Sequence, residues 1–396
     1  MSRARILYLD VLFENESGGD KNRSRFLFQS LRENFGVDLL LIGSEGGSAK
    51  PAWTHFKPLA MFAPQPAPFA RPASTPSFAL ADREKFVSLV RENKYSAVFC
   101  RFTIGWELLE LVQHAAPETA VAVDVDMVSS RLVALTWAAN PSFKKRWFLF
   151  EKWKLLCFER QMFGKPWLFL FTNSTELADV RDGVAPRPAP GEFALVPNIM
   201  PRAGETAVEC QPVILFFGSL DSSANVDGFQ ILVDDVLPQI EADLKRHNVK
   251  IHIVGKNPPA AFAERLRAID TDRVKLVGPM DSIERAIAES QFVLLPLRIA
   301  SGTRTRILEA AAVGRAVITT TIGAEGLDLG DTVSIGDTAA ALATRVRHFL
   351  ENPADAADEG RRLHERSTAL YAATNVAADL GVKLENFLQR KKGGAK

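Results

Sequence analysis

The chain has 396 residues, of which 47% are hydrophobic and 24% are charged, and its formal net charge is +1. These values exclude a disordered chain, a collagen-like repeat and a coiled coil, and the balanced charge gives no general attraction to nucleic acid. The length predicts two to three domains. Three widely spaced cysteines form neither a disulfide framework nor a zinc motif, which favours a reducing compartment.

The sequence shows no targeting or membrane-spanning segment. The apolar run at 6–9 is short and ends at Asp10, whereas a signal peptide needs a longer apolar core. No stretch approaches the roughly 20 apolar residues of a membrane span. We therefore expect a cytoplasmic protein, with peripheral contact with the inner face of a membrane left open.

Strands and helices alternate along the first half. A strand at 4–11, a glycine loop, a helix near 25–35 and a strand at 37–42 form a βαβ unit, which predicts a parallel sheet. Seven prolines within 51–76 predict a long loop, because proline neither donates to a sheet nor continues a helix. The remaining elements expected in this half lie at 79–93, 96–101, 104–115, 120–125, 142–163 and 167–172.

The same rhythm restarts after a proline-rich connection at 197–212. Strands are expected at 213–217, 249–254, 274–277, 291–295 and 315–320, with helices between them and three more helices from 337 to 390. The sequence thus predicts an α/β fold of two tandem doubly wound Rossmann-like domains facing a cleft. The expected domains are 1–200 and 201–375, followed by a helix at 376–396 whose return to the N-terminal domain is left open.

The segment 296–327 carries the clearest chemistry. Its turn into a helix holds Ser301, Gly302 and Thr303, where glycine permits close approach of a ligand and free helix N–H groups attract phosphate. Arg304 and Arg306 add cations that match phosphate, and Glu309 stands in an apolar helix, where two sugar hydroxyls would be suitable donors. The alternative is a plain helix cap, two solvated arginines and a glutamate bonded to backbone.

This segment closely resembles the donor-site signature of the group 1 (family 4) retaining glycosyltransferases, which have the two-domain B-type fold. Four further stretches match in the family's order: 216–221, 253–259, 277–281 and 322–327. The resemblance is strong from about 212 to 330. It is weaker in the N-terminal half, where it consists of the short stretches 172–174 and 196–198.

The resemblance implies transfer of a sugar from a UDP- or GDP-type donor to a glycan, lipid-linked or other acceptor, with retention of configuration and without metal or another cofactor. It assigns Glu309 to the nucleotide ribose, and Arg304 and Arg306 to the diphosphate as candidate catalytic residues. Further donor-binding residues implied are Gly218, Ser219, Gly255, Lys256, Pro279 and Met280. Ser301 stands where the family usually has a first glutamate, so the identity of the sugar is left open.

Two features of the N-terminal half are site candidates. Gly18 and Gly19 follow the first strand, where related enzymes approach the donor phosphate and the acceptor; a plain turn is the alternative. Asp124 and Asp126 have the spacing of a metal-binding Asp-x-Asp pair, but the nucleotide signature lies in the other half. We therefore predict no metal and take Asp126 as a candidate catalytic residue facing the acceptor. His114 and His55 are lesser candidates.

The stretch 142–165 combines seven aromatic residues with seven basic and two acidic ones. This composition favours contact with an anionic membrane, and a half-buried helix on the sheet explains the aromatics equally well. Two other function classes also stay open. One is an enzyme of the same fold similar to the nucleotide-sugar 2-epimerases. The other is a catalytically silent scaffold in polysaccharide assembly.

Overall fold

The computed structural model describes residues 3–11, 19–43, 58–68, 71–72, 74–139, 147–202, 208–220, 222–255, 258, 260–269, 273–280, 282–300, 302 and 304–393. The chain forms two compact units. The first comprises 1–130, 143–198 and 373–396, and the second comprises 131–142 and 199–372. The expected boundaries therefore differ at 131–142, which belong to the second unit rather than to the N-terminal one.

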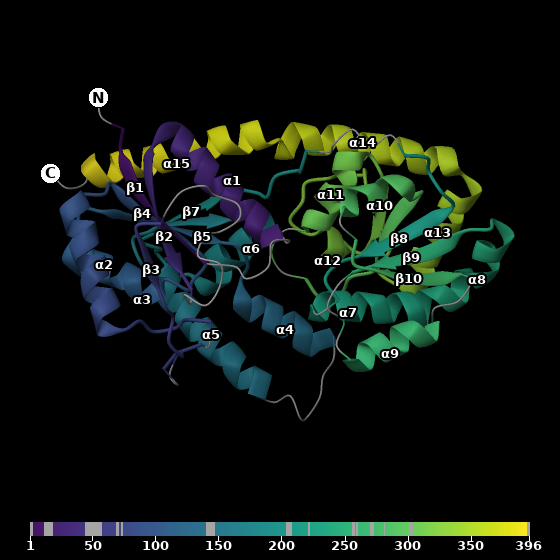
Figure 1. Cartoon of the computed structure of the whole chain (residues 1–396), viewed down its shortest axis with the longest axis horizontal. Helices are drawn as coiled ribbons and strands as arrows, with labels where there is room; N and C mark the ends of the chain where they lie inside the picture. The colour runs from purple at the N-terminus through teal and green to yellow at the C-terminus, as the bar shows by residue number, and fades with distance from the viewer. Residues whose placement is uncertain are drawn as a thin grey trace. The chain divides into compact units, whose positions relative to one another are not determined.

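The first unit is built on a seven-stranded sheet of order β3-β2-β1-β4-β5-β6-β7, in which all ladders are parallel. Its elements (Figure 1) are β1 (Arg5–Val11), α1 (Gly19–Asn34), β2 (Gly36–Ile42), β3 (Ala60–Phe62), α2 (Leu80–Asn93), β4 (Ala97–Arg101), α3 (Trp106–Ala115), β5 (Ala120–Val125), the start of α4 (Ser129–Ala139), α5 (Trp147–Phe163), β6 (Leu168–Phe171), α6 (Ser174–Asp179), η2 (Val180–Val184), β7 (Glu192–Leu195) and α15 (Ala373–Gly393).

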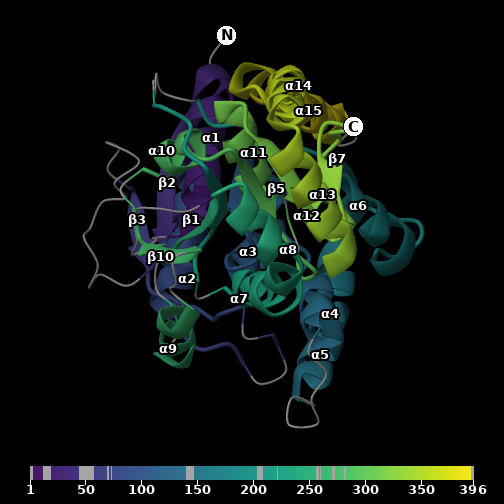
Figure 2. The same cartoon turned by 90° about the vertical axis from the view of Figure 1, so that its right-hand side faces the viewer.

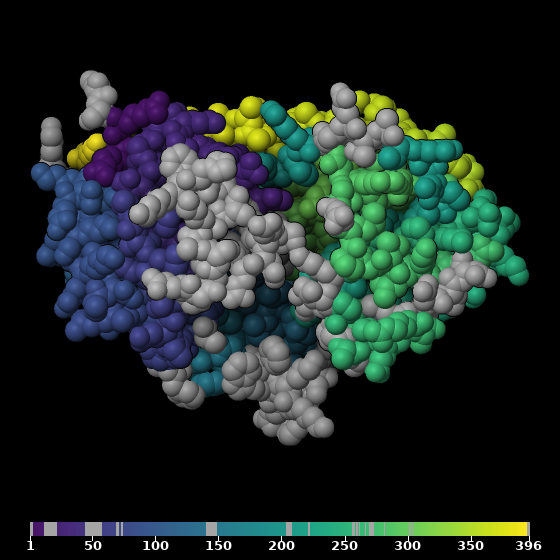
Figure 3. All heavy atoms as spheres, in the orientation of Figure 1, coloured from purple at the N-terminus to yellow at the C-terminus, as the bar shows by residue number. Residues whose placement is uncertain are grey.

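Helices cover both faces of this sheet, so its central strands are buried and mostly apolar, with charged residues only toward their ends. Leu7 and Leu9 of β1 belong to a core shared with α2, α3 and α5. Tyr8, between them in the strand, points to the other face and packs edge-on against Phe28 of α1. The C-terminal helix α15 lies beside α1 and forms the yellow edge of this unit in Figure 3.

The proline-rich segment 51–76 differs from the long loop expected. Residues 60–62 form β3, which pairs in parallel with β2 at the edge of the sheet. Proline is tolerated beside a short edge strand because few ladder hydrogen bonds are needed there. The helix α4 and the strand β7 also had no counterpart in the expected order of elements.

The second unit has a six-stranded parallel sheet of order β10-β9-β8-β11-β12-β13. Its elements (Figures 1 and 2) are β8 (Val213–Phe217), α7 (Ser223–Gln230), η3 (Ile231–Val236), α8 (Leu237–Arg246), β9 (Lys250–Val254), α9 (Ala260–Ile269), β10 (Val274–Gly278), α10 (Ile283–Glu289), β11 (Phe292–Leu295), α11 (Thr305–Val313), β12 (Ala316–Thr319), α12 (Thr321–Ala324), β13 (Ser334–Ile335), α13 (Ala339–Glu351) and α14 (Pro353–Tyr371).

This sheet is also covered on both faces. Ile214 and Phe216 of β8 pack in one core with the α7–η3–α8 segment and α13, whereas Leu215 and Phe217 pack in the other with α10, α11 and α14. Each unit is thus the doubly wound α/β architecture predicted from the alternating pattern. Within the described part of the chain, no helix is both long and apolar enough to cross a bilayer.

Candidate functional site

The point where the strand order of the second sheet reverses lies between β8 and β11. The chain moves from β8 outward to β9 and β10 and then returns to β11 on the other side of β8. In open α/β sheets, ligands bind at the carboxyl ends of the strands at such a point. The loop after β8 begins with Gly218, and the loop after β11 leads through Gly302 into α11. Both belong to the predicted donor site.

Glu309 and Arg306 share one face of α11, because residues three apart are neighbours on a helix. The Arg306 guanidinium donates through Nη1 to the Phe217 carbonyl oxygen at 2.9 Å, which ties α11 to the end of β8. Burial lowers the pKa of Arg306 to about 10, and Glu309 opposes this shift. Burial raises the pKa of Glu309, and Arg306 opposes it. The Glu309 carboxylate accepts no hydrogen bond from any residue that the structure describes.

Arg304 stands immediately before α11 and is buried. Its Nη1 donates to the carbonyl oxygen of Gly302, which has a left-handed backbone with φ of 72°. This hydrogen bond holds the Arg304 side chain against the backbone just before the N-terminus of α11. The N–H groups of a helix N-terminus and a fixed cation form a favourable setting for phosphate.

Two glycines bring the ends of β8 and β9 close together. A Cβ on Gly255 would lie 2.2 Å from the Gly218 carbonyl oxygen, and a Cβ on Gly218 would lie 2.7 Å from Nδ2 of Asn225. Asn225 in turn donates through Nδ2 to the Ser219 carbonyl oxygen at 2.7 Å. Gly218 and Gly255 are therefore required for packing of this edge. Asn225 was not among the predicted site residues, although it lies in the first turn of α7, just after the Gly218 loop.

Two of the remaining predicted donor-binding residues lie just after β10. Pro279 is exposed and Met280 is partly buried just after β10, with Met280 packed against the apolar core of that face. Lys256, Ser301 and Thr303 lie outside the described residues, as does Gly18 of the first unit. Gly19 is the first residue of α1.

The equivalent edge of the first sheet holds a buried ionic cluster. The register of β4 and β5 pairs Arg101 with Asp124. The Asp124 carboxylate accepts from Arg101 and also from Arg23 of α1, whose Nε lies 3.0 Å from Oδ2. All three side chains are buried. Burial raises the pKa of Asp124, but the two arginines lower it further, so it lies below its usual range.

Asp126 lies at the margin of this cluster. Its Oδ1 is 3.8 Å from Arg23 Nε and 4.0 Å from Arg101 Nη1. Asp10, at the end of β1, is also buried; its Oδ1 accepts from the Val11 N–H at 2.8 Å. Burial raises the pKa of Asp10 to about 6, and Arg101 opposes this shift. The cluster therefore places three carboxylates and two guanidiniums at the switch point of this sheet.

The two arginines also explain features that the sequence left open. Arg23 donates to the Val196 and Pro197 carbonyl oxygens and to Asn198 Oδ1. The stretch 196–198 is thereby tied to α1 and to the buried cluster. Neither arginine was predicted, because the sequence separates Arg23 from Asp124 by 101 positions. Buried arginines become visible only once the strand register is known.

Both carboxylates of the Asp124–Asp126 pair lie near Arg23 and Arg101, and Asp124 makes the closer contacts. Among the residues that the structure describes, no group of three His, Cys, Asp or Glu side chains is placed to hold a metal ion. Metal independence stays a prediction. His114 contacts the Glu110 carbonyl oxygen at 3.0 Å through Nδ1 in the last turn of α3, and His55 lies outside the described residues.

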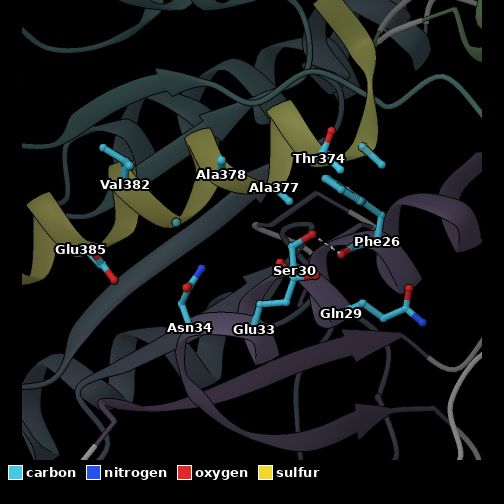
Figure 4. A pocket seen from close by; sticks show the side chains of 12 residues that line it. Phe26, Gln29, Ser30, Glu33, Asn34, Thr374, Ala377, Ala378, Val382 and Glu385 are labelled. Carbon is cyan, nitrogen blue, oxygen red and sulfur yellow. Dashed lines mark hydrogen bonds between the residues drawn. The ribbon is translucent and has the colours of Figure 1, made fainter. Parts of the chain in front are cut away.

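A groove of about 540 Å³ lies between α1 and α15 of the first unit (Figure 4). Phe26 and Ser30 of α1 face Ala377 of α15 across it, and Glu33 and Glu385 lie on its rim. None of its lining residues is a predicted site residue. It lies along helices rather than at the carboxyl edge of the sheet.

Residues 211–352 match the family described as glycosyl transferases group 1. These residues include β8, α11 and the Glu309 site. The chain carries a group 1 glycosyltransferase domain. No curated protein matches the chain.

Solved structures of B-type glycosyltransferases share the fold of the whole chain. The sucrose-phosphate synthase of Thermosynechococcus elongatus is 17% identical over 100% of both chains, with a TM-score of 0.69. Anabaena HepE in complex with UDP is 13% identical, covering 96% of this chain and 100% of its own, with a TM-score of 0.67. A TarM variant of S. aureus in complex with fondaparinux, alpha-GlcNAc-glycerol and UDP is 9% identical over 97% and 99%, with a TM-score of 0.68. The whole chain thus has the fold of these glycosyltransferases, as the resemblance implied.

Proposed function

We propose that the second unit of this glycosyltransferase binds a UDP- or GDP-type sugar donor, with Glu309 accepting hydrogen bonds from the ribose hydroxyls. The observation that carries the proposal is the Glu309 carboxylate, partly buried and without a hydrogen-bond donor in the described part of the chain. The carboxylate therefore keeps its acceptor capacity, and a ligand that supplies two hydroxyl donors is favoured. Similar structures that contain UDP support a nucleotide of this class.

Arg304 and the backbone around Gly302 then stabilise the departing diphosphate. The negative charge on the leaving group grows in the transition state, so a fixed cation beside it lowers the barrier as well as aiding binding. Arg306 has one nitrogen committed to the Phe217 carbonyl oxygen and presents the rest of its guanidinium from α11. We propose retention of configuration and independence of metals and other cofactors, as the family resemblance implies.

The acceptor, a glycan or a lipid-linked molecule, is assigned to the first unit. Asp126 is the residue that we propose faces it, because it lies just past β5 at the margin of the buried cluster. The protein is expected to work in the cytoplasm, with peripheral membrane contact through 142–165.

The ribose assignment is tested with UDP, GDP and their 2′-deoxy analogues by calorimetry. Glu309→Gln should weaken nucleotide binding about tenfold or more, because each charged hydrogen bond contributes roughly 1.5–3 kcal/mol. The variant should also lose the preference for the ribose form over the 2′-deoxy form. Glu359→Gln, a buried glutamate of α14 bonded to Ser334, is the matched control. Equal discrimination by the Glu309 variant and the wild type would rule out this role.

The transfer chemistry needs separate tests. Arg304→Ala should lower kcat more than it weakens donor binding if the charge acts in the transition state. Equal losses would assign it to ground-state anchoring. The anomeric configuration of the product tests retention, and activity in excess chelator tests metal independence. Conversion of the donor without any acceptor would favour an epimerase instead.

A further inference from the structure

The helix α5 is apolar on its solvent side as well as on its core side. Leu155, Phe158 and Met162 are buried against the sheet. Four large apolar side chains on the other side are exposed: Leu149 by 46%, Phe150 by 41%, Trp153 by 60% and Leu156 by 37%. We call these four residues the α5 stripe. A surface helix normally presents polar residues to water. An apolar outer face therefore indicates a surface that binds a partner or a membrane.

The charges of α5 are sorted by sign between its two sides. Both acidic residues are buried: Glu151 pairs with Lys154 at 2.9 Å, and Glu159 accepts from the N–H and hydroxyl of Ser130. Arg160, by contrast, is exposed, and Lys152 is partly exposed. The outer face therefore combines apolar side chains with cations and has no exposed carboxylate within the helix.

The aromatic members of the stripe form a single platform. The Phe150 and Trp153 rings are stacked, with centroids 6.0 Å apart, and Lys154 Nζ lies 5.6 Å from the Phe150 ring centre. In Figures 1 and 2 the first turns of α5 extend beyond the sheet of the first unit. The platform is therefore carried on a projecting part of this unit.

We infer that the α5 stripe docks onto the interface of an anionic lipid bilayer. Trp, Phe and Leu enter the boundary between headgroups and acyl chains, while Lys and Arg remain at the level of the anionic headgroups. A second copy of the chain is a poorer occupant, because a stable interface needs about 20–30 residues on each side and the stripe supplies four. Resting on the proposed transfer function, this docking makes the acceptor a lipid-linked molecule.

The test is co-sedimentation with vesicles of phosphatidylcholine alone or mixed with phosphatidylglycerol. The protein should bind the anionic vesicles, and added salt should weaken the binding. Trp153→Glu should lower the partition coefficient about tenfold or more, because it replaces a large apolar side chain by a negative charge that the anionic headgroups repel. Leu80→Glu is the matched control, because Leu80 is 65% exposed on α2 of the same unit. It should bind as the wild type does.

Three results would overturn the inference. The first is absence of binding to anionic vesicles, and the second is an equal loss in the Leu80 and Trp153 variants. The third is a dimer that Trp153→Glu dissociates while vesicle binding is unchanged. UDP binding by each variant is measured in parallel, together with its thermal midpoint. Normal UDP binding without vesicle binding would reject docking alone, whereas vesicle binding without any nucleotide binding would reject the proposed function alone.

Discussion

The carboxylates at the carboxyl edges of the two sheets differ in their hydrogen-bond partners and in the direction of their pKa shifts. In the first unit, Asp124 is enclosed by the guanidiniums of Arg23 and Arg101, and its pKa lies below its usual range. In the second unit, Glu309 has Arg306 as a charged neighbour, receives no hydrogen bond from a described residue, and has a raised pKa. Both edges lie at a point where the strand order reverses.

This difference separates structural from ligand-binding carboxylates. Asp124 is satisfied by the protein and has little capacity left for a ligand, whereas Glu309 retains the capacity of an acceptor. Removing Asp124 should therefore damage the fold. Removing the charge of Glu309 should damage binding and spare the fold. Measurements of stability and of nucleotide binding on variants of both edges test this distinction.

The largest effect is expected for Asp124→Ala. It leaves two buried guanidiniums without their shared counter-ion, and breaking a buried pair in this way costs about 3–5 kcal/mol. Urea unfolding followed by circular dichroism measures the loss. Asp358→Ala is the control, because Asp358 forms exposed ion pairs with Arg361 and Arg362 and such pairs contribute little. A similar midpoint for the two variants would remove the structural role of the cluster.

Asp10→Asn tests how this cluster contributes to the pH dependence of stability. Burial raises the pKa of Asp10 from 3.8 to about 6. The folded state therefore binds more protons than the unfolded state between these values, so this residue's contribution to stability falls as pH rises through that window. The variant should be more stable than the wild type at pH 7 by on the order of 2–3 kcal/mol, with the difference vanishing below pH ~4. A difference that does not change with pH would contradict this assignment.

The loss of an uncharged helix-capping side chain in each unit gives a reference for the loss of stability in the charged cluster. Asn173 accepts from the N–H groups of Thr175 and Glu176 at the start of α6, and Thr338 accepts from the Ala341 N–H at the start of α13. Asn173→Ala and Thr338→Ala should each cost about 1 kcal/mol. Unfolding by urea checks both. Costs as large as that of Asp124→Ala would mean that the charge cluster is not exceptional.

The smallest effect on stability is expected for Glu309→Gln, and its sign is reversed. Because burial raises the pKa of Glu309, its ionisation disfavours the folded state as pH rises above the ordinary glutamate range. The variant should be at least as stable as the wild type at neutral pH while binding nucleotide more weakly. Thermal midpoints across pH, with and without UDP, measure both. Clear destabilisation of the free variant would place Glu309 with Asp124 as a structural carboxylate.

Local pattern was sufficient for the order of elements. Parallel strands buried on both faces read as short apolar runs, and these predicted β1, β5 and β8 within about a residue of their observed bounds. The edge strand β3 was missed because a three-residue strand among prolines leaves almost no periodic signal. Glu309 was predictable as a site candidate because a carboxylate in an apolar helix is conspicuous in sequence.

Two doubly wound α/β units, the family resemblance of the second, and Asp126 and Glu309 as candidate carboxylates were thus predictable from the sequence. Which carboxylates the protein neutralises depends on tertiary contacts. Arg23 and Arg101 reach Asp124 through a strand register and a helix packing that join distant parts of the chain. Folding also turns the acids of α5 inward and leaves Phe150 and Trp153 exposed. The physical reason is that the energy of a charge depends on what surrounds it, and those surroundings exist only after folding.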